Sequence, residues 1–263
     1  MDQVDMVSAL LQIQQSIKEK RFFQVVTLNA EILYKAQKDE KLLSLINQAS
    51  LVTADGHGVV WAGDRLDQPK LERVTGIDLM QEVCRHAAVN NWRLFLLGGE
   101  PAVAKMAADN LKMQYEGIEI CGEAHGFFLK KENGEAEVVR RIKEAAPDVL
   151  FVGMGAPMQE FWIEKNREHL GNLVAIGIGG SFDVLAGRVR RAPSVWQKLH
   201  LEWLWRVLME PKRAGRILVL PLFQLKVIRE ASRLKRQLQE QQDPNDIERR
   251  EALLRHQRRK QKK

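Results

Sequence analysis

Short apolar runs alternate with longer stretches of helical periodicity through the first two-thirds of the chain, and this alternation constrains the fold more than any other feature. Several runs are almost continuously apolar, as expected of strands that are covered by helices on both faces. The alternation predicts an α/β fold with a doubly wound, mostly parallel sheet. The predicted strands are Phe22–Leu28, Ser50–Ala54, Arg93–Leu97, Ile118–Cys121, Val149–Gly153 and Leu173–Ile178, and the predicted helices include Ile77–Ala88, Ala102–Tyr115, Glu135–Ala145 and Met158–His169.

Glycines and short polar side chains follow five of the predicted strands. Ligands of parallel sheets bind beyond the carboxyl ends of the strands, so these loops are predicted to share one ligand site. The loops contain Thr27 and Asn29, Asp55-Gly56-His57-Gly58, Gly98-Gly99, Gly153 through Gln159, and Gly179 through Asp183. Thr27, Asn29 and Gln159 carry uncharged donor and acceptor groups that suit sugar hydroxyls and amides. Their convergence on one edge is more informative than any one of them.

Two carboxylates belong to this predicted edge. Asp55 can act as a general base toward a nucleophilic hydroxyl that lies within hydrogen-bond reach. Asp183 can accept hydrogen bonds from a nucleoside base or a ribose. An Asp after a strand is also common in a turn or at a helix cap, and this alternative stays open for both residues.

Gly98-Gly99 follows a strand and precedes a helix that is predicted to begin near Pro101. This geometry directs backbone N–H groups and a helix N-terminus toward an incoming anion, which suits a diphosphate. Neither GxGxxG nor GxxxxGK[ST] is complete, so the dinucleotide and P-loop interpretations are weak. A tight turn that needs glycine for its backbone is the alternative.

No motif in the sequence predicts a metal site. The six histidines are scattered, and neither HxxxH, HExxH nor DxD occurs. A departing diphosphate must then be stabilised by helix N-termini and cationic side chains. Arginines are available for this on both sides of Pro193: Arg188, Arg190, Arg191, Arg206, Arg213 and Arg216. A solvated basic helix is the alternative explanation for the last three.

Charge is divided unevenly along the chain. Residues 1–183 carry 20 Lys and Arg against 26 Asp and Glu, whereas residues 184–263 carry 21 against 8. A basic region of net charge +13 behind a mildly acidic body indicates an anionic partner surface, either nucleic acid or anionic membrane. The two cysteines, Cys84 and Cys121, form no CxxC, and intracellular, reducing conditions fit best.

Beyond Pro193, Trp196, Leu199, Trp203 and Leu204 recur at helical spacing among basic residues. This pattern is typical of a helix lying in a membrane interface, and also of a helix docked on its own domain. The basic charge favours the membrane, because Lys and Arg each gain about 1 kcal/mol near anionic lipid. No run of about 18 apolar residues predicts a membrane span. The predicted parts are a catalytic domain over 1–193, an amphipathic helical appendage over 194–240 with a helix from Pro211 to about Gln239, and a disordered charged tail over 241–263.

These loops, in this order, resemble the WecG/TagA/CpsF glycosyltransferase family over roughly residues 10 to 230. The matching motifs are Thr27-Leu-Asn29, Ala54-Asp-Gly-His-Gly58, Thr75-Gly-Ile-Asp78, Phe95-Leu-Leu-Gly-Gly99, His125-Gly126-Phe-Phe, Gly153-Met-Gly-Ala-Pro-Met-Gln159, Gly179-Gly-Ser-Phe-Asp183, Arg191-Ala-Pro193, Glu202-Trp-Leu-Trp-Arg206 and Glu210-Pro-Lys-Arg-Ala-Gly-Arg216. So many ordered motifs make chance agreement improbable.

The resemblance implies the Rossmann-like fold classed as GT-E and, from TagA-type members, transfer of N-acetylmannosamine from UDP-ManNAc to undecaprenyl-diphosphate-GlcNAc. That step inverts the anomeric centre, forms a β-1,4 link and commits lipid to wall teichoic acid. It needs neither metal nor other cofactor. The resemblance places the catalytic base on Asp55 and further active-site residues on Thr27, Asn29 and Gln159. It implies substrate-binding positions at Gly56, Asp78, Gly98, Gly99, Phe128, Gly153, Gly180, Asp183, Arg191, Arg206, Arg213 and Arg216.

The resemblance also implies an enzyme that self-associates and works on the inner face of the cell membrane, reached through its C-terminal appendage. Related members use UDP-N-acetylmannosaminuronate or UDP-glucose, and no residue decides among the donors. Two hypotheses of other classes remain: a nicotinamide-dependent oxidoreductase, which the missing GxGxxG disfavours, and a nucleic-acid-binding module that uses the basic tail, although no nucleic-acid partner is expected.

Overall fold

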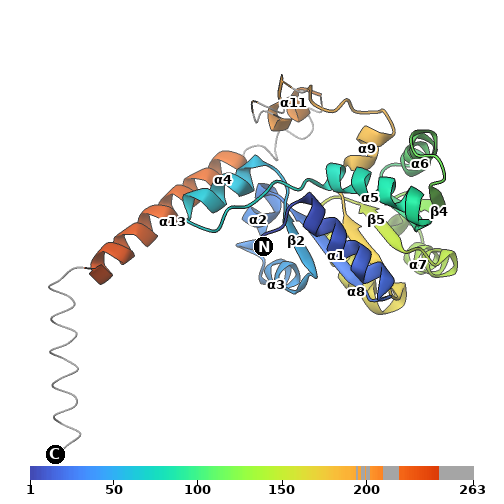
Figure 1. The fold of residues 1–263 in the computed structure, drawn as a ribbon, viewed down its shortest axis with the longest axis horizontal. Coiled ribbons are helices and arrows are strands. Elements are labelled where there is room, and N and C mark those ends of the chain that lie inside the picture. The colour runs from blue at the N-terminus through green and yellow to red at the C-terminus, as the bar shows by residue number, and fades with distance from the viewer. Residues whose placement is uncertain (194, 197–198, 200–201, 210–218, 243–263) are drawn as a thin grey trace, which may run out of the picture.

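A computed structural model describes residues 1–193, 195–196, 199, 202–209 and 219–242 (Figure 1). Its centre is one six-stranded sheet in the order β2-β1-β6-β5-β3-β4, in which every pair of neighbouring strands is parallel. The predicted α/β class with a parallel, doubly wound sheet is therefore confirmed. The strands are β1 (Phe23–Leu28), β2 (Leu51–Ala54), β3 (Arg93–Gly98), β4 (Glu119–Ala124), β5 (Val149–Gly153) and β6 (Val174–Gly177).

Each predicted strand exists, and the observed bounds of all but β5 differ from the predicted ones by a few residues. β5 has the predicted bounds, whereas β4 runs three residues further, to Ala124, because it pairs with β3 through a register shift at Leu94 and Phe95. The four predicted helices correspond to α5 (Gly76–Asn90), α6 (Val103–Gln114), α7 (Gly134–Ala145) and α8 (Met158–Leu170). Helices that were not predicted are α1 (Met6–Lys18), α2 (Ala30–Ala36), α3 (Glu40–Gln48) and α4 (His57–Arg65).

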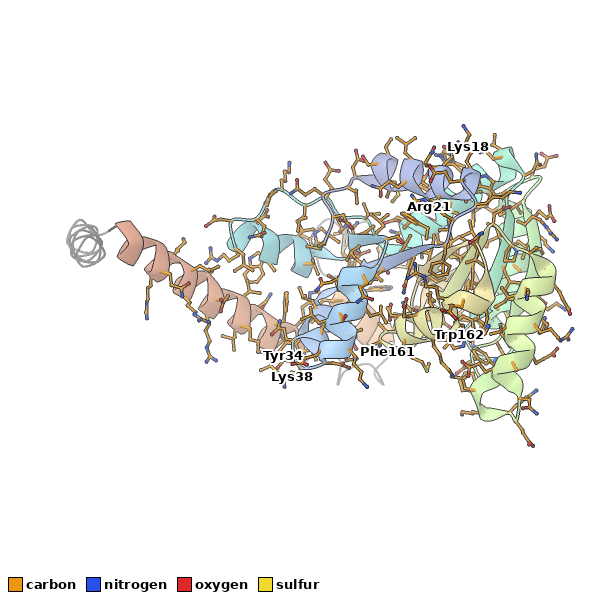
Figure 2. All side chains as sticks on the ribbon, turned by 90° about the horizontal axis from the view of Figure 1, so that it is seen from below. Lys18, Arg21, Tyr34, Lys38, Phe161 and Trp162 are labelled. Carbon is orange, nitrogen blue, oxygen red and sulfur yellow. The ribbon has the colours of Figure 1, made fainter. Side chains whose placement is uncertain are left out.

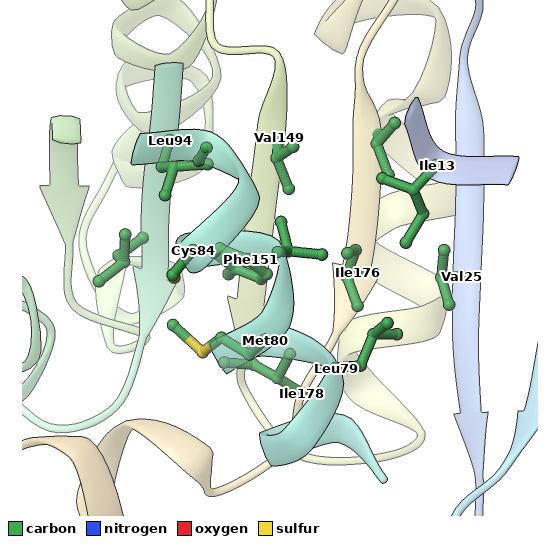
Figure 3. Packing of buried hydrophobic residues seen from close by; sticks show 14 of the residues in the cluster. Ile13, Val25, Leu79, Met80, Cys84, Leu94, Val149, Phe151, Ile176 and Ile178 are labelled. Carbon is green, nitrogen blue, oxygen red and sulfur yellow. The ribbon is translucent and has the colours of Figure 1, made fainter. Parts of the chain in front are cut away.

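Alternate residues of each central strand point to opposite faces of the sheet. On one face, α1, α5, α6 and α9 (Ser181–Leu185) cover side chains such as Phe151 and Ile176, and Figure 3 shows Met80 and Cys84 of α5 packed over them. On the other face, α7 and α8 cover Leu97, Val152 and their neighbours, while α2 and α3 cover the β1–β2 side. Helices therefore cover both faces of the sheet, and the residues at the strand ends are held in place by this packing.

The N-terminal segment protects the outer edge of β2. The backbone N–H of Asp2 donates to the carbonyl of Val52 at 3.0 Å, and the N–H of Val52 donates to the Asp2 carboxylate at 2.7 Å. Asp2 thus satisfies both backbone groups of Val52 at the edge of the sheet.

The long C-terminal helix α13 (Val219–Gln242) begins against the body and projects away from it (Figure 1). Phe223, Val227 and Ala231 are buried along one face, where α13 contacts α2 and α4. Figure 2 shows Tyr34 of α2 near the start of α13, where the Lys226 ammonium lies 5.0 Å from the ring centroid. The first half of α13 thus shares a core with residues 1–193. The predicted start at Pro211 lies outside the described residues. The helix runs to Gln242, three residues beyond its predicted end near Gln239, so the first two residues of the tail predicted over 241–263 are helical. The rest of that predicted tail lies outside the described residues.

A short helix, α11 (Glu202–Met209), lies between the body and α13 in the chain. Arg73 donates to the Glu202 carboxylate at 2.8 Å, and the indole N–H of Trp205 donates to the carbonyl of Arg190 at 3.0 Å. Two polar contacts of this kind hold α11 near the carboxyl edge of the sheet. In the described part of the chain, no helix has the length and apolar character to cross a membrane.

Candidate active site

A cavity of about 1440 Å³ opens at the carboxyl edge of the sheet. Its walls come from the segments after all six strands, and residues of α11 and α13 complete it. Ten of the residues predicted to form the site line this cavity: Thr27, Asn29, Asp55, Gly56, Gly99, Gly153, Gln159, Gly180, Asp183 and Arg191. Loops that are up to 164 positions apart in the sequence therefore meet around one space, as the parallel sheet requires.

Asp55 directly follows β2, and its backbone N–H donates to the carbonyl of Leu28 at 2.9 Å. The N-cap position of the next helix, α4, is Gly56, so the Asp55 carboxylate is not that helix's cap. It accepts a long hydrogen bond of 3.4 Å from the N–H of Gly76, the first residue of α5. A helix N-terminus suits a negatively charged group. The carboxylate thus lines the cavity in a position where a negative charge is favoured.

Thr27 and Asn29 are fixed by bonds within the protein. The Thr27 hydroxyl, which is buried inside β1, donates to the carbonyl of Gly177 in β6 at 2.8 Å. The side-chain oxygen of Asn29 accepts from the N–H of Ile32 at 3.0 Å and so caps α2. Asn29 is therefore both a helix cap and a cavity residue, and its cap uses only the oxygen of the amide.

Gln159 projects from the first turn of α8 toward the end of β6. Its side-chain oxygen accepts from the N–H of Gly179 at 3.0 Å, and its side-chain nitrogen donates to the carboxylate of Glu160 at 2.7 Å. Only 1% of Gln159 is exposed, although it lines the cavity. Glu160 was not predicted as a functional residue, because a Glu after a Gln on a helix gives no pattern by which to recognise it.

Asp183 and Arg191 place opposite charges on the same wall. Asp183 lies in the first turn of α9, and its carbonyl accepts from the N–H groups of Arg188 and Val189, which folds the following turn back on the helix. Arg191 donates to the Asp78 carboxylate at 2.6 Å. The buried Nε of Arg191 has no hydrogen-bond partner among the described residues. Arg191 lines the cavity, and its positive charge suits an anion bound there.

Residues 1–237 match the family described as Glycosyl transferase WecG/TagA/CpsF family. The chain belongs to this family. It is also 42% identical over 213 residues to an N-acetylglucosaminyldiphosphoundecaprenol N-acetyl-beta-D-mannosaminyltransferase of Staphylococcus aureus strain MW2, covering 81% of this chain and 82% of that protein. The enzyme of the same name from strain NCTC 8325 / PS 47 is 41% identical over the same shares. The resemblance drawn from the motifs is confirmed, and the chain is a glycosyltransferase.

Within this glycosyltransferase, the N–H of Gly99 in the Gly98-Gly99 turn is bonded inside the protein. The N–H of Gly99 donates to the carbonyl of Gly153 at 3.0 Å, and α6 begins only at Val103, beyond the predicted start near Pro101. Gly98 does not line the cavity, and a Cβ there would stand 2.3 Å from the carbonyl oxygen of Gly153. The close approach of β3 to β5 explains this glycine. Gly99 itself lines the cavity, and the binding of a diphosphate at this turn stays a prediction.

Two other predicted residues lie behind the wall of the cavity. Asp78 accepts from the Thr75 hydroxyl at 2.7 Å and from Arg191, so it orients an arginine that faces the cavity without lining the cavity itself. Phe128 is buried in the core, where its ring meets the Trp162 ring edge-on at 5.8 Å between centroids. Its neighbour Phe127, 41% exposed, lines the cavity instead. The apolar ring of Phe128 packs in the core against residues of α7 and α8.

Three predicted arginines cannot be placed. Arg213, Arg216 and the side chain of Arg206 lie outside the described residues. Among the residues that the structure does describe, no group of three or more His, Cys, Asp and Glu is arranged to hold a metal ion. Cavity residues that the sequence did not single out include Trp61, Lys130 and Met209.

Proposed function

We propose that this glycosyltransferase moves N-acetylmannosamine from UDP-ManNAc to the GlcNAc of undecaprenyl-diphosphate-GlcNAc through a β-1,4 bond, a committed step of wall teichoic acid or related surface polysaccharide synthesis. Both Staphylococcus aureus relatives are named for the transfer of N-acetyl-beta-D-mannosamine to N-acetylglucosaminyldiphosphoundecaprenol. The observation that carries the proposal is the presence of Asp55, Gln159 and Asp183 around a single cavity. With a volume of about 1440 Å³, the cavity exceeds the usual range for one small ligand and suits a donor together with the acceptor's sugar.

The proposed chemistry is a single displacement. Asp55 removes the proton from the acceptor hydroxyl, whose oxygen attacks the anomeric carbon from the face opposite UDP. The bond from that carbon to the diphosphate oxygen breaks, and UDP leaves with the electron pair. Since attack and departure are on opposite faces, the configuration at the anomeric carbon inverts.

Three cavity residues are assigned to the two sugars. Thr27, Asn29 and Gln159 present hydroxyl and amide groups, which match the hydroxyls and N-acetyl groups of the substrates. Because each of the three is already held by a bond to the protein, each offers a donor or acceptor of fixed direction.

The nucleotide is assigned to the β6–α9 side of the cavity. Asp183 accepts hydrogen bonds from the ribose or base, and the turn at Gly179-Gly180 lets the ligand approach the backbone. Arg191 lines this side of the cavity and is assigned to the diphosphate, as are Arg206, Arg213 and Arg216. The positive charge of these side chains stabilises UDP as it leaves.

The lipid acceptor is proposed to reach the cavity from an anionic membrane, with the enzyme peripheral on its inner face and able to self-associate. Support comes from large apolar side chains exposed on the two C-terminal helices: Trp203, Leu208, Met209, Leu222, Leu225, Ile228 and Leu234. The exposed basic residues Arg229, Arg233, Lys235 and Arg236 accompany them on α13. Exposed apolar side chains close to basic ones suit the interface of an anionic membrane.

Product mass tests the proposal directly. The protein is incubated with a lipid-diphosphate-GlcNAc analogue and UDP-ManNAc, UDP-ManNAcA, UDP-glucose or UDP-GlcNAc in separate reactions. We expect added mass from N-acetylmannosamine only with UDP-ManNAc. A product from UDP-ManNAcA or UDP-glucose instead would keep the reaction type and replace the donor, whereas no product from any UDP-sugar would overturn the proposed reaction.

A further inference from the structure

Glu160 is a carboxylate in an unexpected place. It is 1% exposed, and its Oε2 atom has no hydrogen-bond partner among the described residues. Loss of solvent around it raises the pKa of its carboxyl group. Burying an acid with one oxygen unpaired costs stability, so stability does not explain why a Glu stands here.

The partner of Glu160 is Gln159, and the contact fixes which way the Gln159 amide faces. The backbone N–H of Gly179 can only donate, so the amide atom that it meets at 3.0 Å is the oxygen. The amide nitrogen must then face the other way, where Glu160 accepts from it at 2.7 Å. The Gly179 N–H, which can only donate, and the Glu160 carboxylate, which accepts, therefore exclude the flipped orientation of the Gln159 amide.

The backbone of β6 is shaped around this pair. A Cβ on Gly177 would lie 2.6 Å from the Gln159 nitrogen and 3.1 Å from Oε1 of Glu160, so the space that the pair occupies depends on glycine. The carbonyl of the same Gly177 accepts from the Thr27 hydroxyl. One strand end thus aligns two of the residues assigned to the sugars.

We propose that Glu160 is a positioning residue, which holds the Gln159 amide so that its second N–H is presented to the substrate sugars. The inference rests on the proposed function, because it gives Gln159 a sugar to meet. Gln159 is 1% exposed at the cavity wall. A rotation of its amide by half a turn would replace the N–H donor there with the oxygen, which is an acceptor. Glu160 does not touch the substrate and acts only through Gln159.

Substitutions at Glu160 separate positioning from a merely structural role. E160M keeps the side-chain length and removes the acceptor, and misplacement of a sugar-binding group is expected to lower kcat/KM for transfer by about 10- to 100-fold. E160Q restores an acceptor oxygen and is expected to recover most of that loss. The matched control is E164M, the same change one turn later on α8 at a more exposed Glu, which should behave as wild type.

A double-mutant cycle asks whether Glu160 works through Gln159. If it does, the Q159A/E160M protein is no slower than Q159A alone. If the two losses multiply, Glu160 has an independent role and the inference is overturned. The melting temperature of E160M is measured in parallel, and a transfer loss that only follows a loss of folded protein would also overturn it.

Gly177 supplies a second route that removes no polar group. The atom that G177A would press against is the end of a flexible side chain, so the protein can fold while the Gln159 amide is displaced. We expect G177A to lose transfer on the scale of E160M while it keeps a cooperative melting transition. A folded G177A with wild-type turnover would contradict the proposed orientation.

Hydrogen exchange of the Gln159 side-chain amide gives a measurement that needs no turnover. Its NMR signals, assigned by their absence in Q159A, should exchange slowly in the wild type and faster in E160M. Unchanged exchange in E160M would overturn the positioning role. Faster exchange in E160M together with a wild-type protein that transfers no sugar would leave the contact standing and remove the proposed function instead.

Discussion

The floor of the cavity, formed by the residues that follow the strands, differs in burial from its C-terminal cover, formed by α11 and α13. Floor residues such as Thr27 and Gln159 are at most 4% exposed and are bonded to the ends of buried strands. In the cover, Trp203 is 41% and Met209 47% exposed, and α11 is tied to the body by the contacts of Glu202 and Trp205. A rigid floor fixes reacting groups, whereas the exposed side chains of α11 leave apolar surface for a partner. Chemistry and access are thus assigned to different parts of the chain.

The largest effect is expected on the floor, at Asp55. D55N keeps the size of the side chain and removes the base, so kcat should fall by about 10²- to 10⁴-fold while UDP affinity is kept. Steady-state transfer and UDP calorimetry measure the two quantities. D64N, the same change at an exposed Asp of α4, is the control and should retain activity. Turnover near wild type in D55N would remove Asp55 from the role of base.

The next effect concerns the docking of α13 and compares neighbouring residues. Phe223 is 1% exposed against α2 and α4, whereas Leu222 is 48% exposed. F223A should lower the free energy of unfolding by about 3 kcal/mol through the cavity it leaves. L222A should change it by less than about 0.5 kcal/mol. Denaturant unfolding of both variants measures the difference, and equal values would show that α13 does not share the core of the body.

A smaller effect is expected from the basic residues of α13, whose loss should weaken binding to anionic vesicles. Arg229 and Arg236 are exposed seven residues apart on α13, and about 1 kcal/mol each near anionic lipid predicts a roughly 30-fold loss of vesicle affinity in R229Q/R236Q. K105Q/K112Q removes the same charge at the same spacing from α6, at the other end of the molecule (Figure 1). Sedimentation with anionic vesicles measures binding. Equal losses in both variants would indicate a general charge effect and no membrane-facing α13.

The sequence predicts the floor better than the cover for a physical reason. Val149–Gly153 reads as a strand because a buried parallel strand must be apolar throughout, and the loops after such strands necessarily meet at one edge. The short helix α2 was missed, and its cap, Asn29, is also a cavity residue. A residue suited to two roles gives a pattern that identifies neither.

Two outcomes depended on contacts that no local pattern contains. Gly98 is a glycine because of Gly153, which lies 55 positions away and touches it only once β3 pairs with β5. Glu160 looks like a solvated residue on a charged helix, and only the packing of α8 against β6 buries it. Positions whose identity is set by a partner across the sheet therefore need the structure.

The smallest effect is expected at the contact that joins the two regions. Arg73 and Glu202 are about one quarter exposed, and an ion pair of this kind contributes less than about 1 kcal/mol. E202Q should therefore leave the melting temperature nearly unchanged, while transfer falls only a few-fold because α11 is held less firmly over the cavity. E82Q, which breaks the exposed pair between Glu82 and Arg85 on α5, is the control. A loss as large as that of D55N would mean that the cover takes part in the chemistry, and the division between floor and cover would no longer hold.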